Sequence, residues 1–310
     1  MIFVFLFSFD YNQNVRMSLN RPIWKLKDWI NIDKIDWEML SLNENAIDLL
    51  KENPEKINWN YLSLNENAID LIKENQEKIN WNYLSENNNA IKILEQNWDK
   101  INWKLLSSNN NAIDLLKENP EKINWNVLSR NKNAIDILKK NLNKINWNKL
   151  SKNYNAIKIL EQNWDKINWM YLSENKNAIH LLKKNPEMIV WEYLSLNENA
   201  IDLLKENKDK INWDSLSENP NGIELLKQNI NNINWIYLSS HINAIDLLEA
   251  NQDKIDWDNL SYNPSIFELD YEKMRINNQE MYEELIKEVM KPSRVFKNPD
   301  YDYLEELFGD

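Results

Sequence analysis

Residues 59–80 read WNYLSLNENAIDLIKENQEKIN, and this stretch recurs with few changes along most of the chain. We number each copy from its Trp, position 1, to the residue before the next Trp, position 22. A fixed period in this range predicts a solenoid of stacked units, each too small to bury its apolar side chains alone. Eleven Trp residues mark the units without a slip in spacing: Trp37, Trp59, Trp81, Trp103, Trp125, Trp147, Trp169, Trp191, Trp213, Trp235 and Trp257.

Each unit predicts two helical elements. Between Asn65 and Asn75 the apolar residues fall at helical spacing and the charged residues lie on the other side, which is typical of a short amphipathic helix. The Asn at position 7, which precedes Pro220 and Pro264 in two units, suits the N-cap of this helix. The second element is the Trp-x-x-Leu-Ser segment. Whether it is α or 3-10, and whether it already begins at Pro54, stays open.

Aligned on their Trp, the units hold the same residue type at many positions, and we call each such position a column. These columns predict an all-α solenoid of about eleven units with helical caps. We expect the Trp, Leu, Ala and Ile columns to form the core, so that Trp147, in a middle unit, is a core residue. The Ser and Asn columns, such as Ser63, Asn65, Asn67 and Asn75, are expected to stack from unit to unit and bind unpaired backbone groups. Because packed helices lie about 8–10 Å apart, the array is expected to extend on the order of 100 Å as a curved rod.

The ends of the array depart from the repeat, as the capping units of solenoids do. Trp24 and Trp29 predict a partial repeat over the first unit, and Ile266 and Phe267 replace the pattern ahead of an amphipathic helix over 277–291. The apolar opening lacks a basic segment and is too short to span a bilayer, and Met1 and Met17 both remain candidate start residues. The predicted parts are an N-terminal extension over 1–16, an N-terminal cap over 17–36, ten tandem repeats over 37–256, a degenerate repeat with a C-terminal helical cap over 257–291, and an acidic-aromatic tail over 292–310.

The composition excludes several classes of chemistry. The chain has no Cys, which excludes disulfides, thiolate nucleophiles and Cys-ligated zinc. Gly222 and Gly309 are the only glycines, which excludes a Gly-rich phosphate loop. His180 and His241 stand in different columns without a partner His, and the serines belong to a repeated column, so neither a metal site nor a catalytic triad is indicated. The sequence therefore predicts a protein without catalytic activity or cofactor.

Charge is unevenly distributed over the variable positions. The whole chain has 37 basic and 49 acidic residues, a net charge of −12, which disfavours general binding to nucleic acid or anionic lipid. Residues 125–184 differ, with 12 − 4 = +8, while the remainder carries 25 − 45 = −20. We call residues 125–184 the basic belt and interpret it as a docking site for an acidic partner. The candidate partner-binding residues are Arg130, Lys132, Lys139, Lys140, Lys149, Lys152, Tyr154 and Lys176.

The unit W-x-x-L-S-x-N-x-N-A-I-x-L-L-x-x-N-P-x-K-I-N resembles the tandem-repeat proteins of giant, mimivirus-like DNA viruses. The stretch Asn263–Glu268 that closes the array and the segment Lys291–Arg294 resemble endings in that group, and the resemblance spans roughly residues 22–300. It implies a viral origin and a place in the host cytoplasm, the viral factory or the virion. It implies no activity, cofactor or catalytic residue.

Three functions remain open from the sequence. The first is a scaffold for protein–protein interaction, because solenoids present variable positions on a constant frame. The second is nucleic-acid binding through the basic belt, which lacks the Arg-rich and aromatic character of base-stacking surfaces apart from Tyr154. The third is a structural component of a virion or viral factory that associates with itself. No membrane partner is predicted.

Overall fold

The computed structural model describes residues 22–289, which are mostly helical. Residues Leu26–Phe267 form one compact unit, and the described part of a second unit comprises 22–25 and 268–289. In the first unit every Trp of the repeat begins a helix, capped in ten of the eleven units by the Asn or Asp before it, whose side chain accepts a backbone N–H. These Trp helices are α2 (Trp37–Leu40), α4 (Trp59–Leu62), α6 (Trp81–Glu86), α8 (Trp103–Leu106), α10 (Trp125–Leu128), α12 (Trp147–Lys152), α14 (Trp169–Glu174), α16 (Trp191–Leu196), α18 (Trp213–Glu218), α20 (Trp235–Ser239) and α22 (Trp257–Tyr262).

The predicted amphipathic helices are present but begin later than their predicted cap. The Asn at position 7 caps the turn before the helix instead, as Asn65 does by accepting the N–H of Asn67 at 3.0 Å. The helix starts at the Ile of position 11, after an Ala that supplies no side-chain cap. These helices are α3 (Ile47–Glu52), α5 (Ile69–Glu74), α7 (Ile91–Gln96), α9 (Ile113–Glu118), α11 (Ile135–Lys139), α13 (Ile157–Glu161), α15 (Ile179–Lys184), α17 (Ile201–Glu206), α19 (Ile223–Lys227) and α21 (Ile245–Glu249).

Short 3-10 helices join these elements and settle where the Trp helix begins. The segment that starts at Pro54 is a separate 3-10 turn, and the α-helix begins only at the following Trp. The turns before Trp helices are η2 (Ile32–Lys34), η3 (Pro54–Lys56), η5 (Trp98–Lys100), η6 (Pro120–Lys122), η7 (Leu142–Lys144), η9 (Trp164–Lys166), η10 (Pro186–Met188), η11 (Lys208–Lys210), η12 (Ile230–Asn232) and η14 (Gln252–Lys254). Four more precede amphipathic helices or β2: η4 (Glu66–Ala68), η8 (Tyr154–Ala156), η13 (Ile242–Ala244) and η15 (Pro264–Ile266).

The core lies between the two helices of each unit and between neighbouring units. The Leu at position 4 and the Leu or Ile at position 14 are fully buried, as Leu150 and Leu160 show at 0% exposure. The Ala at position 10 is buried as well, for example Ala156 at 0%. Each buried Leu or Ile side chain contributes roughly 1.5–3 kcal/mol of transfer free energy. The core is therefore aliphatic.

The Trp column is not part of this core, and the prediction that Trp147 is a core residue was wrong. All eleven Trp side chains are half-buried. In nine units a Lys ammonium lies over the indole, 4.2 to 5.2 Å from the ring centroid, and in eight of them it comes from position 20 of the same unit. A Lys stem covers apolar surface while its charge stays in water, so the large ring is shielded without being enclosed.

The predicted stacking of the Ser and Asn columns is confirmed for three of the four. Ser63 Oγ accepts, at 2.9 Å, the backbone N–H of Asn80, which ends the same unit and caps the next Trp helix. Asn65 Nδ2 donates to the carbonyls of Ser41 and Asn43 in the previous unit, at 3.1 and 2.9 Å. The Asn at position 9 also donates to a backbone carbonyl of the previous unit, as Asn67 does to Glu44. His241 stands in place of the Asn at position 7, and its Nε2 lies 2.7 Å from the Asn219 carbonyl oxygen. The fourth column, at position 17, bonds within its own unit.

The first and last repeats contact each other as neighbours do, so the predicted extended rod was wrong. Asp36 N–H donates to Ser261 Oγ at 2.9 Å, and Asn43 Nδ2 donates to the carbonyls of Ser261 and Asn263 at 3.0 Å each. Lys34 Nζ lies 4.9 Å from the ring centroid of Trp257. Each of these contacts repeats, across more than 200 residues, a contact found within one unit or between adjacent units elsewhere in the array. The array therefore closes on itself.

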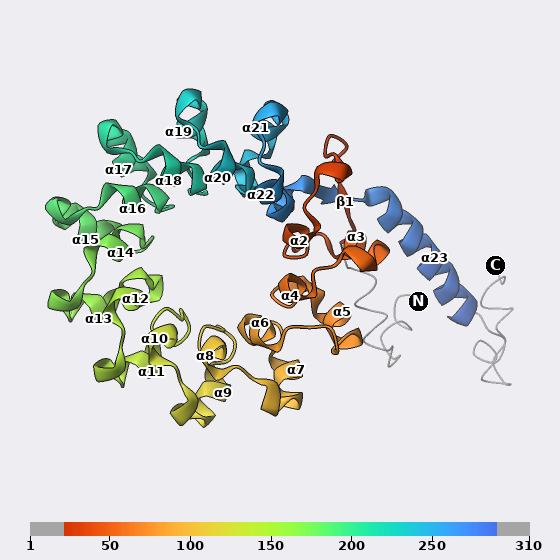
Figure 1. Cartoon of the computed structure of the whole chain (residues 1–310), viewed down its shortest axis with the longest axis horizontal. Helices are drawn as coiled ribbons and strands as arrows, with labels where there is room; N and C mark the ends of the chain where they lie inside the picture. The colour runs from red at the N-terminus through yellow and green to blue at the C-terminus, as the bar shows by residue number, and fades with distance from the viewer. Residues whose placement is uncertain (1–21, 290–310) are drawn as a thin grey trace, which may run out of the picture. The chain divides into compact units, whose positions relative to one another are not determined.

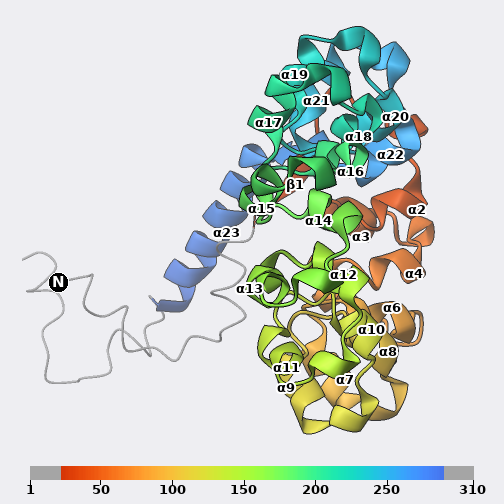
Figure 2. The ribbon, with the colours of Figure 1, turned by 90° about the vertical axis from the view of Figure 1, so that its left-hand side faces the viewer.

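The unit Leu26–Phe267 is thus a ring of eleven repeats, with the Trp helices on its inner side and the amphipathic helices on its outer side (Figure 1). Seen from the edge, the two sets of helices follow opposite rims of the band (Figure 2). Closure needs a rotation of 360° divided by eleven, about 33° per repeat. Because curvature follows from a small rotation repeated at every interface, the packing of one unit on the next determines whether the array closes.

Two short strands join the ends of the repeat array, where the sequence predicted caps. Strand β1 (Trp24–Leu26) pairs with β2 (Phe267–Leu269), and Lys27 N–H donates to the Ile266 carbonyl at 2.9 Å. The first repeat meets the last, so neither has an exposed end for a cap to cover. Helix α23 (Tyr271–Val289) begins six residues before the predicted helix because Asp270 caps it. The side chains of Met281, Leu285 and Val289 and the predicted tail over 292–310 lie outside the described residues.

Candidate interaction surface

The variable positions of the Trp helices lie together on one side. At 100° per residue, positions 2, 3 and 6 project away from the buried Leu and Ser at positions 4 and 5. Position 6 changes from unit to unit in charge, size and polarity. It differs in this from the columns that form the core and from the Ser and Asn columns that hydrogen-bond one unit to the next. Its eleven occupants are Leu42, Leu64, Glu86, Ser108, Arg130, Lys152, Glu174, Leu196, Glu218, Ser240 and Tyr262.

Side chains at position 6 interact across more than one repeat. The positive charge of Arg130 acts on Glu86, two units away, and Glu174 acts on Glu218, again two units away. Lys152 acts on Glu218 from three units away. Charges that shift a pKa in this way lie close together, which helices stacked about 8–10 Å apart permit only on the concave side of a curved array. Position 6 therefore faces the inside of the ring.

Two carboxyl groups on this concave side are harder to ionise than usual. Burial raises the pKa of Glu86, and the nearby Arg130 charge opposes that rise only in part. Burial also raises the pKa of Glu218, where repulsion from Glu174 adds to the effect and Lys152 opposes it.

We expect Glu86→Gln and Glu218→Gln each to raise the melting temperature at pH 7. A carboxyl with a raised pKa binds its proton more tightly in the folded state, so its contribution to stability falls as pH rises from 4.5 through the folded pKa. The advantage of Gln is therefore present at pH 7 and disappears near pH 4.5. Thermal unfolding at both pH values measures this, with the exposed Glu118→Gln as the control. Loss of stability at pH 7 would show that Arg130 or Lys152 outweighs burial.

The eight predicted partner-binding residues do not form one surface. Arg130, Lys149 and Lys152 occupy positions 3 and 6, on the side of the Trp helices described above. Lys139 and Lys140 end the amphipathic helix α11 on the outer side of the ring. The third group occupies position 8 of three successive units and comprises Lys132, Tyr154 and Lys176.

Part of the basic belt is neutralised by neighbouring units. Lys152 Nζ lies 2.6 Å from Glu174 Oε1, and Lys176 Nζ lies 2.6 Å from Glu198 Oε1. Lys176 also lies 4.6 Å from the ring centroid of Tyr154, and its hydrogen bond to Glu198 raises the pKa of its ammonium group. Counting charges along the sequence missed these pairs, because the partner acids stand 22 residues away. Tyr154 is accordingly covered by a cation of its own chain.

The structure reveals an apolar group of residues that the sequence interpretation overlooked. Trp169 is one of two repeat Trp residues that no Lys covers in the described part of the chain, since Met188 holds position 20 of its unit. Trp164 packs edge-on against Trp169, with ring centroids 5.1 Å apart. Trp164, Met170 and Met188 are 43%, 42% and 37% exposed. The signal in the sequence was the loss of a consensus Lys at one position.

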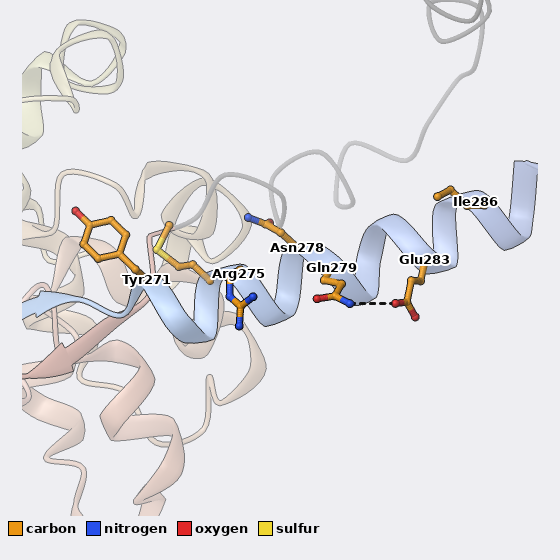
Figure 3. A pocket seen from close by; sticks show the side chains of 7 residues that line it. Tyr271, Arg275, Asn278, Gln279, Glu283 and Ile286 are labelled. Atoms are coloured by element: carbon orange, nitrogen blue, oxygen red, sulfur yellow. Dashed lines mark hydrogen bonds between the residues drawn. The ribbon is translucent and has the colours of Figure 1, made fainter.

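A shallow depression on α23 offers no comparable site. Its lining consists of Tyr271, Met274, Arg275, Asn278, Gln279, Glu283 and Ile286, all from this one helix (Figure 3). Gln279 Nε2 donates to Glu283 Oε1 at 3.3 Å, so these two polar groups are turned toward each other along the helix. Since no described residue outside this helix lines the depression, it is a poor candidate for small-molecule binding.

Between residues 22 and 289 no three His, Asp or Glu side chains converge in a way that could hold a metal ion. None of the helices in this range is both long enough and apolar enough to cross a bilayer. Comparison of the chain with protein-family models, with curated proteins and with solved structures gives no match.

Proposed function

We propose that this protein is a non-catalytic scaffold whose ring of repeats binds other proteins. The observation that carries the proposal is that constant and variable positions are separated within each repeat. Positions 4, 5, 7, 9, 10 and 14 are occupied by nearly constant residues, which form the core and the hydrogen bonds between units. Positions 2, 3 and 6 vary and lie side by side on the concave side, where a partner could contact several units at once. Repeat proteins commonly bind through such concave surfaces.

Nucleic-acid binding receives less support from the same observations. A nucleic-acid surface needs unpaired cations aligned along a groove. Here Lys139 and Lys140 are separated from Lys149 by the thickness of the repeat, and Lys152 and Lys176 are paired with Glu side chains. Self-association as a virion or factory component, and a place in the host cytoplasm, rest on the viral resemblance alone and stay proposals.

A peptide library displayed on phage tests the scaffold proposal directly. We expect panning on the immobilised ring to enrich peptides whose binding depends on the Trp helices. Tyr171 and Tyr193, at position 3 of adjacent units, form an edge-on pair with ring centroids 6.1 Å apart and are only half-buried. Changing both to Ala should weaken at least some enriched peptides tenfold or more, because interface aromatics often dominate binding.

The matched control is a double change on the outer side of the ring. Asp114→Ala with Asp202→Ala removes exposed side chains from two amphipathic helices and should leave the same peptides unaffected. If panning enriches no peptide that binds the ring above background, the proposal is contradicted. Peptides that respond to the outer change and ignore the inner one would contradict it as well.

A further inference from the structure

We infer that Trp164, Trp169, Met170, Met188 and Val190 form an apolar docking strip for an acidic partner segment that carries large apolar side chains. This inference rests on the proposed function and names the chemistry of the partner. In the seventh unit, which begins at Trp169, two polar features of the ring are missing together.

The first missing feature is the ammonium group over the Trp ring. Residues 89–103 and 155–169 are identical in sequence, and each stretch ends in an edge-on Trp pair with ring centroids 5.1 Å apart. Over the first pair, Lys122 Nζ lies 4.5 Å from Trp103 and 5.6 Å from Trp98. At the equivalent position beside Trp164 and Trp169 stands Met188. Among the described residues, the same aromatic pair is thus left without a covering cation.

The second missing feature is a polar bridge between positions 2 and 22. In the sixth unit Asn168 Nδ2 donates to Asn148 Oδ1 at 2.9 Å, and four other units hold an equivalent bond. In the seventh unit these positions carry Met170 and Val190. Both changes replace polar side chains by apolar ones, and both adjoin Trp169. A single exposed apolar residue is ordinary on a protein surface, whereas a contiguous group is typical of an interface.

The surrounding charge selects the partner. The strip lies within and beside the basic belt. Extending the belt to residue 190 adds only one charged residue, Glu187, and the net charge over 125–190 is 12 − 5 = +7. Asp165 and Glu187 stand in the turns of the strip itself, and Lys166, Lys183 and Lys184 are exposed nearby. An acidic segment is therefore steered toward this sector of the ring, while its apolar side chains replace the water on Trp169 and Met188. Met side chains adapt readily to such partners.

Three fluorescein-labelled peptides separate the contributions of charge and apolar contact. The first, DEFLEEWLED, is acidic and apolar, the second, NQFLQQWLQN, keeps the apolar residues without charge, and the third, DEASEEASED, keeps the charge without them. We expect fluorescence anisotropy with the full chain to detect binding of the first peptide at least tenfold tighter than of the other two. Equal binding of the first two peptides would remove the acidic partner from the proposal, and equal binding of the first and third would remove the apolar strip.

The decisive variant is Met188→Lys, which restores the consensus residue and is expected to cover Trp169 as Lys122 covers Trp103. It adds a positive charge, so a purely electrostatic site would bind the acidic peptide more tightly. The strip predicts the opposite, a loss of at least tenfold. Asn232→Lys is the matched control: it adds the same charge beside Trp213, the other repeat Trp that lacks a Lys cover in the described residues, and should leave binding within about twofold.

The outcomes distinguish this inference from the scaffold proposal. Binding that Met188→Lys leaves unchanged or strengthens overturns the strip. Library peptides that depend on Tyr171 and Tyr193 would then still support the scaffold. If ultracentrifugation instead shows rings that associate with each other and separate on Met188→Lys, while no peptide binds, a second copy is the occupant and the acidic partner is ruled out.

Discussion

Asn43→Ala is expected to destabilise the protein as much as Asn131→Ala does. Asn131 lies in the middle of the array and donates to the carbonyls of Ser107 and Asn109, at 3.2 and 2.9 Å. Asn43 makes the same two bonds, at 3.0 Å each, to Ser261 and Asn263 at the far end of the chain. Both amides are buried, at 2% and 1% exposure. Each substitution leaves two carbonyl groups without a donor, at roughly 1–3 kcal/mol per group.

The expected loss is therefore about 2–6 kcal/mol of unfolding free energy for either variant. Urea unfolding followed by circular dichroism and by Trp fluorescence measures it, and the two probes together check that the transition is cooperative. The comparison is sensitive to closure alone, since the two sites are chemically alike. A small effect of Asn43→Ala beside a large effect of Asn131→Ala would mean that the ring is open in solution.

Leu150→Ala is expected to cost more than Trp147→Ala, although Trp is by far the larger residue. Leu150 is fully buried at 0% exposure, and deleting its side chain leaves a cavity that costs about 2–5 kcal/mol. Trp147 is half-buried, with Lys166 Nζ 5.2 Å from its ring, so we expect a loss of only about 1–3 kcal/mol.

Asp136→Ala, on the exposed side of α11, serves as the control and should change stability by less than about 0.5 kcal/mol. Chemical denaturation of the three variants under identical conditions ranks them. If Trp147→Ala caused the largest loss of unfolding free energy, the indole would contribute more to stability than the buried aliphatic residues do, which would contradict an aliphatic core.

The repeat period alone predicted the local structure well. Two helices per unit and the stacked Ser and Asn columns both follow from residues that recur every 22 positions. These features depend on contacts within one unit or between adjacent units. Strict repetition of a residue type therefore determines them without knowledge of the rest of the chain.

Closure could not be predicted in the same way. It depends on a rotation of about 33° at each interface, and a change of a few degrees, summed over eleven interfaces, would leave an open helix. The burial of Trp was misjudged for another reason. Strict repetition of Trp37 and its equivalents is also typical of a half-buried ring that meets a Lys from position 20 in most units, as Lys56 covers Trp37 at 4.2 Å.

The candidate surface was predictable only in part. Adding up charges located the basic belt, but it could not show that Lys152 and Lys176 pair with acids one unit away. It also passed over Met188 and Val190, because neither residue is charged. Comparing each unit with the consensus, column by column, would have identified both as departures in otherwise polar columns.

Closure also fixes how many copies the gene can carry. Identical segments such as residues 40–53 and 194–207 invite recombination that adds or removes whole 22-residue copies. An open solenoid accepts such a change because each repeat contacts only its neighbours. In the ring, ten or twelve copies would require about 36° or 30° at every interface in place of about 33°. Natural variants of this protein are therefore expected to differ in sequence while keeping eleven copies.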